Sequence, residues 1–230
     1  MSKNKPLVAL TLVAGLTLAL SIALKTYAKA GVATQARTDA DVIRQNEKLV
    51  RELAGMGAVA LLTRERFLAL RRNASRDERE QLDTVWRADY RPFDAVNTQE
   101  MKRLLHGRSW FRRSEVGARV AQAAQEIVQH SDDLKFQREV LVKMEPLVGT
   151  PELKGEDYAL LYDRVAISEK RLQRYGTQGT ACQNGKFAIP RDVEDVRNLD
   201  QRRAQMGMEP MAAYLVEEDE MYGACDEPAK

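Results

Sequence analysis

Three residues in the second half of the sequence are of the types that acid–base chemistry requires. His130 is followed by Ser131 and Asp132, and an imidazole beside a carboxylate can act as a general base near neutral pH. Asp163 offers a second carboxylate that can orient such a base. The candidate catalytic residues are therefore His130, Asp132 and Asp163. The alternative interpretation is structural: His130 closes the apolar face of its helix, and Asp132 caps the helix that follows.

The neighbouring Arg164 and a glycine-bearing polar turn are candidate ligand contacts. The planar guanidinium of Arg164 suits two parallel hydrogen bonds to a carboxylate or to carbonyl groups. Tyr175, Thr177 and Gln178 supply a phenol, a hydroxyl and an amide around Gly176, which adopts positive φ without strain. These groups form either a ligand-binding cluster or a buried network that ties a helix to the turn.

No catalytic motif or metal-ligand spacing occurs in the sequence. The patterns G-x-S-x-G, P-loop and H-E-x-x-H are missing. The two histidines and two cysteines do not have the spacing of a zinc site. We therefore predict no metal and no cofactor. Cys182 and Cys225 are candidates for one disulfide in an oxidising compartment, and two free thiols are the alternative.

The first 30 residues have the pattern of an export segment. Lys3 and Lys5 precede an uncharged run over residues 6–24, and Ala28-Lys29-Ala30 resembles a cleavage site. The run is also long enough to remain as a membrane anchor. Residues 1–30 are thus a signal peptide or a signal anchor. Both alternatives predict an exported domain, either periplasmic or held to the inner membrane and facing the periplasm.

The charge of the remaining chain argues against a nucleic-acid partner. Residues 1–30 hold four of the 36 basic residues and no acidic residue, so the remainder, with 32 basic and 34 acidic residues, is nearly neutral. Its arginines alternate with acidic residues, which is typical of a solvated helix face. No basic stripe with interleaved aromatic residues occurs.

The elements that must position the candidate residues are mostly helical. Apolar residues recur at helical spacing through much of the chain, and residues 172–189, which include Asn184-Gly185, lack that period and predict a short β-hairpin or an ordered loop. The fold class is thus mainly α, with one multi-helix domain over residues 40–224, a linker over 31–39 and a tail over 225–230. The predicted helices cover Asp39 or Asp41 to Arg72, a segment opened by the capping box Ser75–Glu78 and broken at Arg91-Pro92, a short helix from Asn97, Glu115–His130, Leu134–Val148, Glu156–Glu169, Pro190–Gly207 and a last helix from Pro210.

An ordered set of short motifs over residues 110–214 resembles a family of uncharacterised bacterial proteins, a domain of unknown function. The resemblance implies one mostly helical domain and no particular reaction. Two pairs depart from the family pattern: its W-P is Trp110-Phe111 here, and its G-L is Gly207-Met208. The residues that carry the resemblance are Trp110, Val116-Gly117, Gln129-His130-Ser131-Asp132, Phe136-Gln137, Tyr158-Ala159 with Leu161, Asp163-Arg164, Tyr175-Gly176-Thr177-Gln178, Leu199-Asp200 with Arg202-Arg203, Gly207-Met208 with Pro210, and Tyr214.

The leading hypothesis is an exported cell-envelope binding or interaction module. Its polar cluster, formed by His130, Asp163, Arg164 and residues 175–178, recognises a small ligand or a peptide, and the N-terminal segment, where uncleaved, contacts the membrane. The first alternative is a metal-independent hydrolase or transferase with His130 as general base. The second is that the cluster is purely structural. All three hypotheses predict that His130, Asp163, Arg164 and Tyr175 lie close together.

Overall fold

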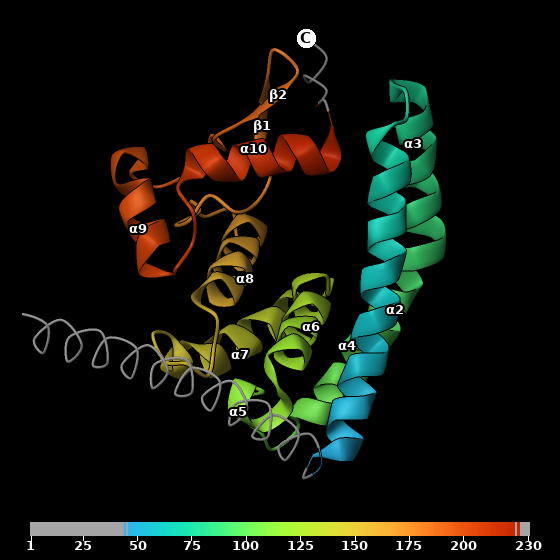
Figure 1. The fold of residues 1–230 in the computed structure, drawn as a ribbon, viewed down its shortest axis with the longest axis vertical. Helices are drawn as coiled ribbons and strands as arrows, with labels where there is room; N and C mark the ends of the chain where they lie inside the picture. The colour runs from blue at the N-terminus through green and yellow to red at the C-terminus, as the bar shows by residue number, and fades with distance from the viewer. Residues whose placement is uncertain (1–43, 45, 224, 226–230) are drawn as a thin grey trace, which may run out of the picture. The chain divides into compact units, whose positions relative to one another are not determined.

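The computed structural model describes residues 44, 46–223 and 225, and the part from Asn46 onwards forms one compact unit (Figure 1). This unit is mainly helical and contains one short antiparallel pair of strands. Its elements are α2 (Glu47–Arg72), α3 (Arg76–Val85), the π-helix η1 (Trp86–Tyr90), α4 (Arg91–Leu105), α5 (Arg113–Val116), α6 (Ala118–Gln129), α7 (Leu134–Met144), the 3₁₀ turn η2 (Glu145–Leu147), α8 (Gly155–Ser168), β1 (Ala181–Gln183), β2 (Lys186–Ala188), the 3₁₀ turn η3 (Val196–Asn198), α9 (Leu199–Gln205) and α10 (Met211–Tyr222).

The N-terminal part of the unit is a helical hairpin. The long α2 runs antiparallel to the continuous α3–η1–α4 segment beside it (Figure 1). The capping box predicted at Ser75 and Glu78 is present. Two ion pairs join the arms of the hairpin, Arg64 to Asp94 and Arg71 to Asp83.

The expected break at Pro92 is wrong, because the chain passes through this residue as a helix. Pro92 lies in the first turn of α4, where a proline is tolerated. The π-helix η1 directly precedes α4, so the helical path continues through this point. The N–H of Arg91 bonds to the carbonyl of Trp86, five residues back, which is the π pattern. The short helix predicted to start at Asn97 is accordingly the interior of α4.

The core of the unit forms where α6 packs against α2, α4 and α8. The predicted helix Glu115–His130 is divided into α5 and α6 by Gly117, whose φ is +84°. The predicted apolar faces of α7 and α8 are buried. The largest side chains that are almost fully buried include Leu53, Met101, Trp110, Phe111, Met144, Leu161 and Leu199.

The C-terminal part combines the predicted hairpin with two helices. Asn184 and Gly185 form the turn between β1 and β2 with φ of +54° and +74°, as a type I′ turn requires. The predicted helix over 190–207 is shorter than expected: residues 190–195 are irregular, and η3 and α9 follow. A disulfide joins Cys182 to Cys225, with the Cα atoms 5.8 Å apart, and so links the hairpin to the end of α10.

The predicted export or anchor segment over residues 1–30 and the linker over 31–39 lie outside the described residues. Among the helices that the structure describes, none has the length and apolar character needed to cross a membrane.

The closest approach of α2 to α6 depends on one glycine. A Cβ added to Gly57 would lie 2.4 Å from the Cβ of Ala123, whereas a Cβ added to Gly55 meets nothing within 4 Å. Of these two glycines in α2, only Gly57 makes the close helix contact.

We expect Gly57→Ala to destabilise the protein by about 1–3 kcal/mol, because the added methyl forces α2 away from α6. The matched control, Gly55→Ala, should instead stabilise it by up to about 1 kcal/mol through helix propensity. Chemical unfolding of the two variants measures both values. A neutral Gly57→Ala would contradict the packing of these helices.

Candidate functional site

The carboxylate of Asp163 holds the polar turn in place. Its side chain on α8 is 0% exposed and accepts the backbone N–H groups of Arg174, Tyr175 and Thr177 at 2.7–3.2 Å. The hydroxyl of Thr177 donates to the same carboxylate at 3.0 Å. Burial raises the pKa of Asp163, and these donors lower it. The sequence left open whether Asp163 or Arg164 ties its helix to this turn, and the hydrogen bonds are made by Asp163.

A second buried group, Gln173, closes the other side of the turn. Its side-chain amide accepts the N–H of Gln178 at 2.9 Å and donates to the carbonyl of Gln178 at 2.7 Å and to Asp192 at 3.0 Å. The side-chain amide of Gln178 bonds back to Thr177 and to the carbonyl of Leu160. The polar groups of this turn therefore satisfy one another.

The segment around His130 ends α6 and is held by other polar side chains. The Gln137 amide, from α7, donates to the carbonyls of Val128, Gln129 and Ser131 at 3.0–3.3 Å. The predicted cap on the next helix is wrong by one residue, because the carboxylate of Asp133 accepts the N–H of Phe136.

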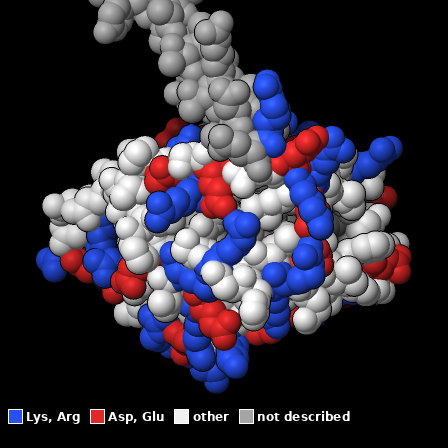
Figure 2. Space-filling view, turned by 90° about the horizontal axis from the view of Figure 1, so that it is seen from below, with Lys and Arg blue, Asp and Glu red and all other residues white. Residues whose placement is uncertain are grey.

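The predicted catalytic partner Asp132 lies in an exposed ion pair. Arg91 donates to both of its carboxylate oxygens, at 2.7 and 2.9 Å. Both side chains of this pair are more than half exposed. On the face shown in Figure 2, basic and acidic side chains are interspersed, and neither sign forms a continuous area.

His130 and Arg164 are electrostatic neighbours, but Asp163 and Tyr175 belong to a different cluster. Burial lowers the pKa of His130 to about 3, and the positive charges of Arg64 and Arg164 add to this effect. Adjacent residues on a helix point about 100° apart, so Asp163 faces the turn while Arg164 faces the end of α6. Among the described residues, no hydrogen bond joins the His130 side chain to Asp163 or Tyr175. The predicted single cluster is therefore divided.

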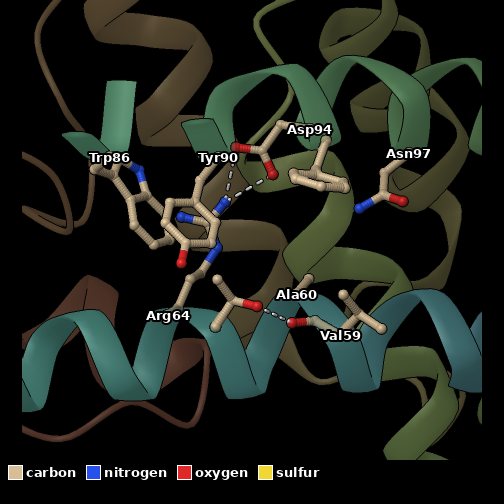
Figure 3. Close-up of a pocket in the computed structure, with 9 residues that line it drawn as sticks. Val59, Ala60, Arg64, Trp86, Tyr90, Asp94 and Asn97 are labelled. Carbon is tan, nitrogen blue, oxygen red and sulfur yellow. Dashed lines mark hydrogen bonds and ion pairs between the residues drawn. The ribbon is translucent and has the colours of Figure 1, made fainter. Parts of the chain in front are cut away.

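The structure adds a pocket in the helical hairpin that sequence reasoning did not find (Figure 3). It lies between α2 and the η1–α4 segment and has a volume of about 140 Å³. The ring of Trp86 stacks on Tyr90, with the ring centres 4.8 Å apart, and the ring of Phe67 lies tilted against it at 4.4 Å. The residues that line the pocket are Val59, Ala60, Thr63, Arg64, Trp86, Tyr90, Phe93, Asp94 and Asn97.

One ion pair supports the wall of this hairpin pocket. Arg64 donates to both carboxylate oxygens of Asp94 at 3.0 Å, and its guanidinium lies 5.3 Å from the centre of the Trp86 ring. Figure 3 shows the Arg64 side chain reaching across the pocket from α2 to Asp94. Because the charges of the pair cancel and both groups are about four-fifths covered, the pocket offers mainly aromatic and apolar surface.

Exposed apolar side chains occur on both helices of the hairpin, and two of them, Val59 and Phe93, line the pocket. Phe93 is 59% exposed and Val96 68% exposed on α4, and Val59 and Leu62 are similarly exposed on α2. An amphipathic helix normally turns such residues inward.

The described residues contain no cluster of three or more histidine, cysteine, aspartate or glutamate side chains that could hold a metal ion.

The sequence did not reveal the buried arginine and glutamine side chains that bond to backbone carbonyls. Gln137, Gln173 and Arg203 all have this role. A lone amide or guanidinium in a sequence does not indicate which carbonyl groups it reaches, so periodicity does not find such contacts.

Comparison with known proteins gives one match. A model of a family of unknown function, DUF6624, matches residues 64–225, a wider range than the residues 110–214 that carried the resemblance in the sequence. No curated protein and no solved structure matches the chain.

We expect Asp163→Asn to destabilise the protein by about 2–4 kcal/mol, because it removes a charged acceptor and turns an amide N–H₂ toward buried N–H donors. The matched control is Asp132→Asn, which removes only an exposed ion pair and should cost less than about 1 kcal/mol. Equilibrium unfolding in urea measures both. Equal effects of the two substitutions would contradict the structural role of Asp163.

Proposed function

We propose that this chain, which belongs to the DUF6624 family of unknown function, is a protein-interaction module. Its hairpin pocket, between α2 and the η1–α4 segment, takes up one large apolar side chain of a partner protein. The observation that carries the proposal is an aromatic-walled pocket surrounded by exposed apolar side chains.

The size of the pocket supports a side chain as its occupant. Sites for drug-sized ligands and cofactors measure roughly 300–1,000 Å³, whereas this pocket measures about 140 Å³. An apolar cavity of roughly 150 Å³ holds one benzene-sized ring. The pocket therefore fits a single aromatic or large aliphatic group and is too small for a nucleotide.

The exposed apolar surface around the pocket supports a partner protein as the source of that side chain. Contiguous apolar patches on a soluble protein mark interaction sites, and binding energy concentrates where one large side chain enters a central pocket. Two antiparallel helices with exposed Val59, Leu62, Phe93 and Val96 offer a groove along which an amphipathic helix can lie. We propose that such a helix, from a different protein, binds in this pocket.

The alternative of a hydrolase or transferase has less support. A general base works best when its pKa lies near the operating pH, and burial beside Arg64 and Arg164 lowers the pKa of His130 to about 3. The carboxylate of Asp163 is occupied by donors of the turn, and Asp132 by Arg91. The residues named for catalysis thus lack both the basicity and the mutual contact that the reaction needs.

We further propose that the domain acts outside the cytoplasm. The pairing of Cys182 with Cys225 supports this, since disulfides persist mainly in oxidising compartments. The charged start, apolar run and small-residue site within residues 1–30 support the same compartment.

A photo-crosslinking residue at Val96 tests the interaction surface in the cells that produce the protein. We expect it to form an adduct with one other protein, because Val96 is exposed on α4 next to Asn97, which lines the hairpin pocket. The same residue at Val142, which is 67% exposed on α7 against 68% for Val96, is the matched control and should give no such adduct. Ala60→Phe, which fills the pocket, should reduce the Val96 adduct by about tenfold.

Two results of this experiment would contradict the proposal. An adduct between two copies of the chain would make the surface a self-association site. If Val96 and Val142 gave the same adduct, or if Val96 gave none, the pocket would not be part of an interaction surface.

The compartment is tested by the thiol state of the full chain recovered from its cells. Alkylation under denaturing conditions without reductant should leave Cys182 and Cys225 unmodified, because both are in the disulfide. A control chain without residues 1–30, retained in the reducing cytoplasm, should be alkylated at both positions. Alkylation of the full chain at both cysteines would overturn the export proposal.

A further inference from the structure

A buried arginine on α9 has no anionic partner in the part of the chain that the structure describes. Arg203 is 1% exposed; its Nε donates to the carbonyl of Glu209 at 2.7 Å and its Nη1 to that of Tyr175 at 2.9 Å. The guanidinium lies 4.8 Å from the centre of the Tyr214 ring. Burying a cation costs several kcal/mol unless a counter-charge compensates, and carbonyls and a ring supply only partial charges. Asp200, Glu156 and Asp163 act on Arg203 electrostatically, but among the described residues no carboxylate forms an ion pair with its guanidinium.

This arginine lines a pocket separate from the one in the helical hairpin. The pocket measures about 290 Å³ and is also lined by Tyr214 and Met208. Two of the guanidinium nitrogens of Arg203 are used by carbonyls, and Nη2 has no hydrogen bond to any described residue. Nη2 is thus the donor available to a group in the pocket. A carboxylate is the ligand that both its charge and its geometry favour.

The other charged residues of this pocket favour a positively charged group at its edge. Lys154 and Glu156 form an ion pair and neutralise each other. Glu209 and Glu217 are exposed, and neither carboxylate has an ion pair or hydrogen bond within the described residues. The pocket therefore combines an unpaired cation at its floor with unpaired carboxylates near the solvent.

We propose that this pocket binds a small zwitterion of the amino-acid class, with its carboxylate on Arg203 and its ammonium group near Glu217. The volume suits this class, because about 290 Å³ is at the lower limit of small-molecule sites and too small for a nucleotide. Met208 and the Tyr214 ring provide apolar surface for the carbon atoms between the two charges. Among the residues of the family-like motifs, Arg203, Met208 and Tyr214 meet at this one place.

Calorimetric titration of the full chain tests the proposal. The probes are the common α-amino acids, with acetate and methylammonium as ligands that carry only one of the two charges. We expect saturable binding of at least one amino acid and weaker binding of both single-charge probes. Glu217→Gln should weaken the amino acid by about fivefold, as expected for a solvent-exposed ion pair, and leave acetate unchanged.

Arg203→Gln should weaken the amino acid by about tenfold or more, because it removes a charged hydrogen bond. The matched control is Arg202→Gln: Arg202 also donates to backbone carbonyls, those of Arg174, Asp195 and Glu194, but does not line the pocket. Its variant should bind as the wild type does.

Three results would overturn the assignment. One is that no amino acid binds to the wild type. Another is that acetate binds as tightly as the amino acid, which would make the pocket a plain anion site. The third is that Glu217→Gln leaves amino-acid affinity unchanged; because Glu217 is exposed, this variant keeps the test decisive even where Arg203→Gln does not fold.

Discussion

The carboxylate of Asp163 is the contact on which the C-terminal part of the domain depends. Between α8 and the β1–β2 hairpin the chain forms an irregular turn, and the backbone N–H groups of Arg174, Tyr175 and Thr177 have no ladder partners there. Each such group left unsatisfied costs roughly 1–3 kcal/mol. One carboxylate satisfies three of them. With the turn fixed, the carbonyl of Tyr175 points toward Arg203, and α9 is attached to α8 through the turn.

The same solution appears at the end of α6 and on the other side of the turn. Gln137 supplies donors to the carbonyls at the end of α6, and Gln173 supplies both a donor and an acceptor to the turn. Buried polar groups must be paired, and a long amide or guanidinium reaches several carbonyls at once. The polar residues that look like an active site in the sequence are mostly the connectors of a fold that has long irregular segments.

The sequence predicted those parts of the fold that depend on local chemistry. Helical spacing located α7 and α8, the Ser75–Glu78 capping box located α3, and Asn184-Gly185 located the hairpin turn. Contacts between distant segments were not predictable in the same way. Asp163 and Arg164 are adjacent, and sequence alone does not establish the rotation of α8 that turns the acid, rather than the base, to the turn.

The candidate site shows the same division between local and distant information. The approach of His130 to Arg164 was anticipated, but its separation from Asp163 depends on how α6 and α8 pack. The hairpin pocket depends on a π-helix that the sequence did not reveal, because Pro92 normally indicates a break. Two residues of its aromatic wall, Trp86 and Tyr90, are the first and last residues of that π-helix.

Functional sites are best sought at residues whose burial or exposure is unfavourable for folding. Asp163, Gln137 and Gln173 are fully used by the fold, so their polarity needs no ligand to explain it. Phe93 is exposed beside an aromatic pocket, and the buried guanidinium of Arg203 has no ion pair among the described residues. Both features are expected to lower stability, and natural domains are only marginally stable. Residues that lower the stability of the folded state are expected at sites with a function other than folding. By this criterion we propose that the functional surfaces of the chain are the apolar hairpin and the arginine-floored pocket.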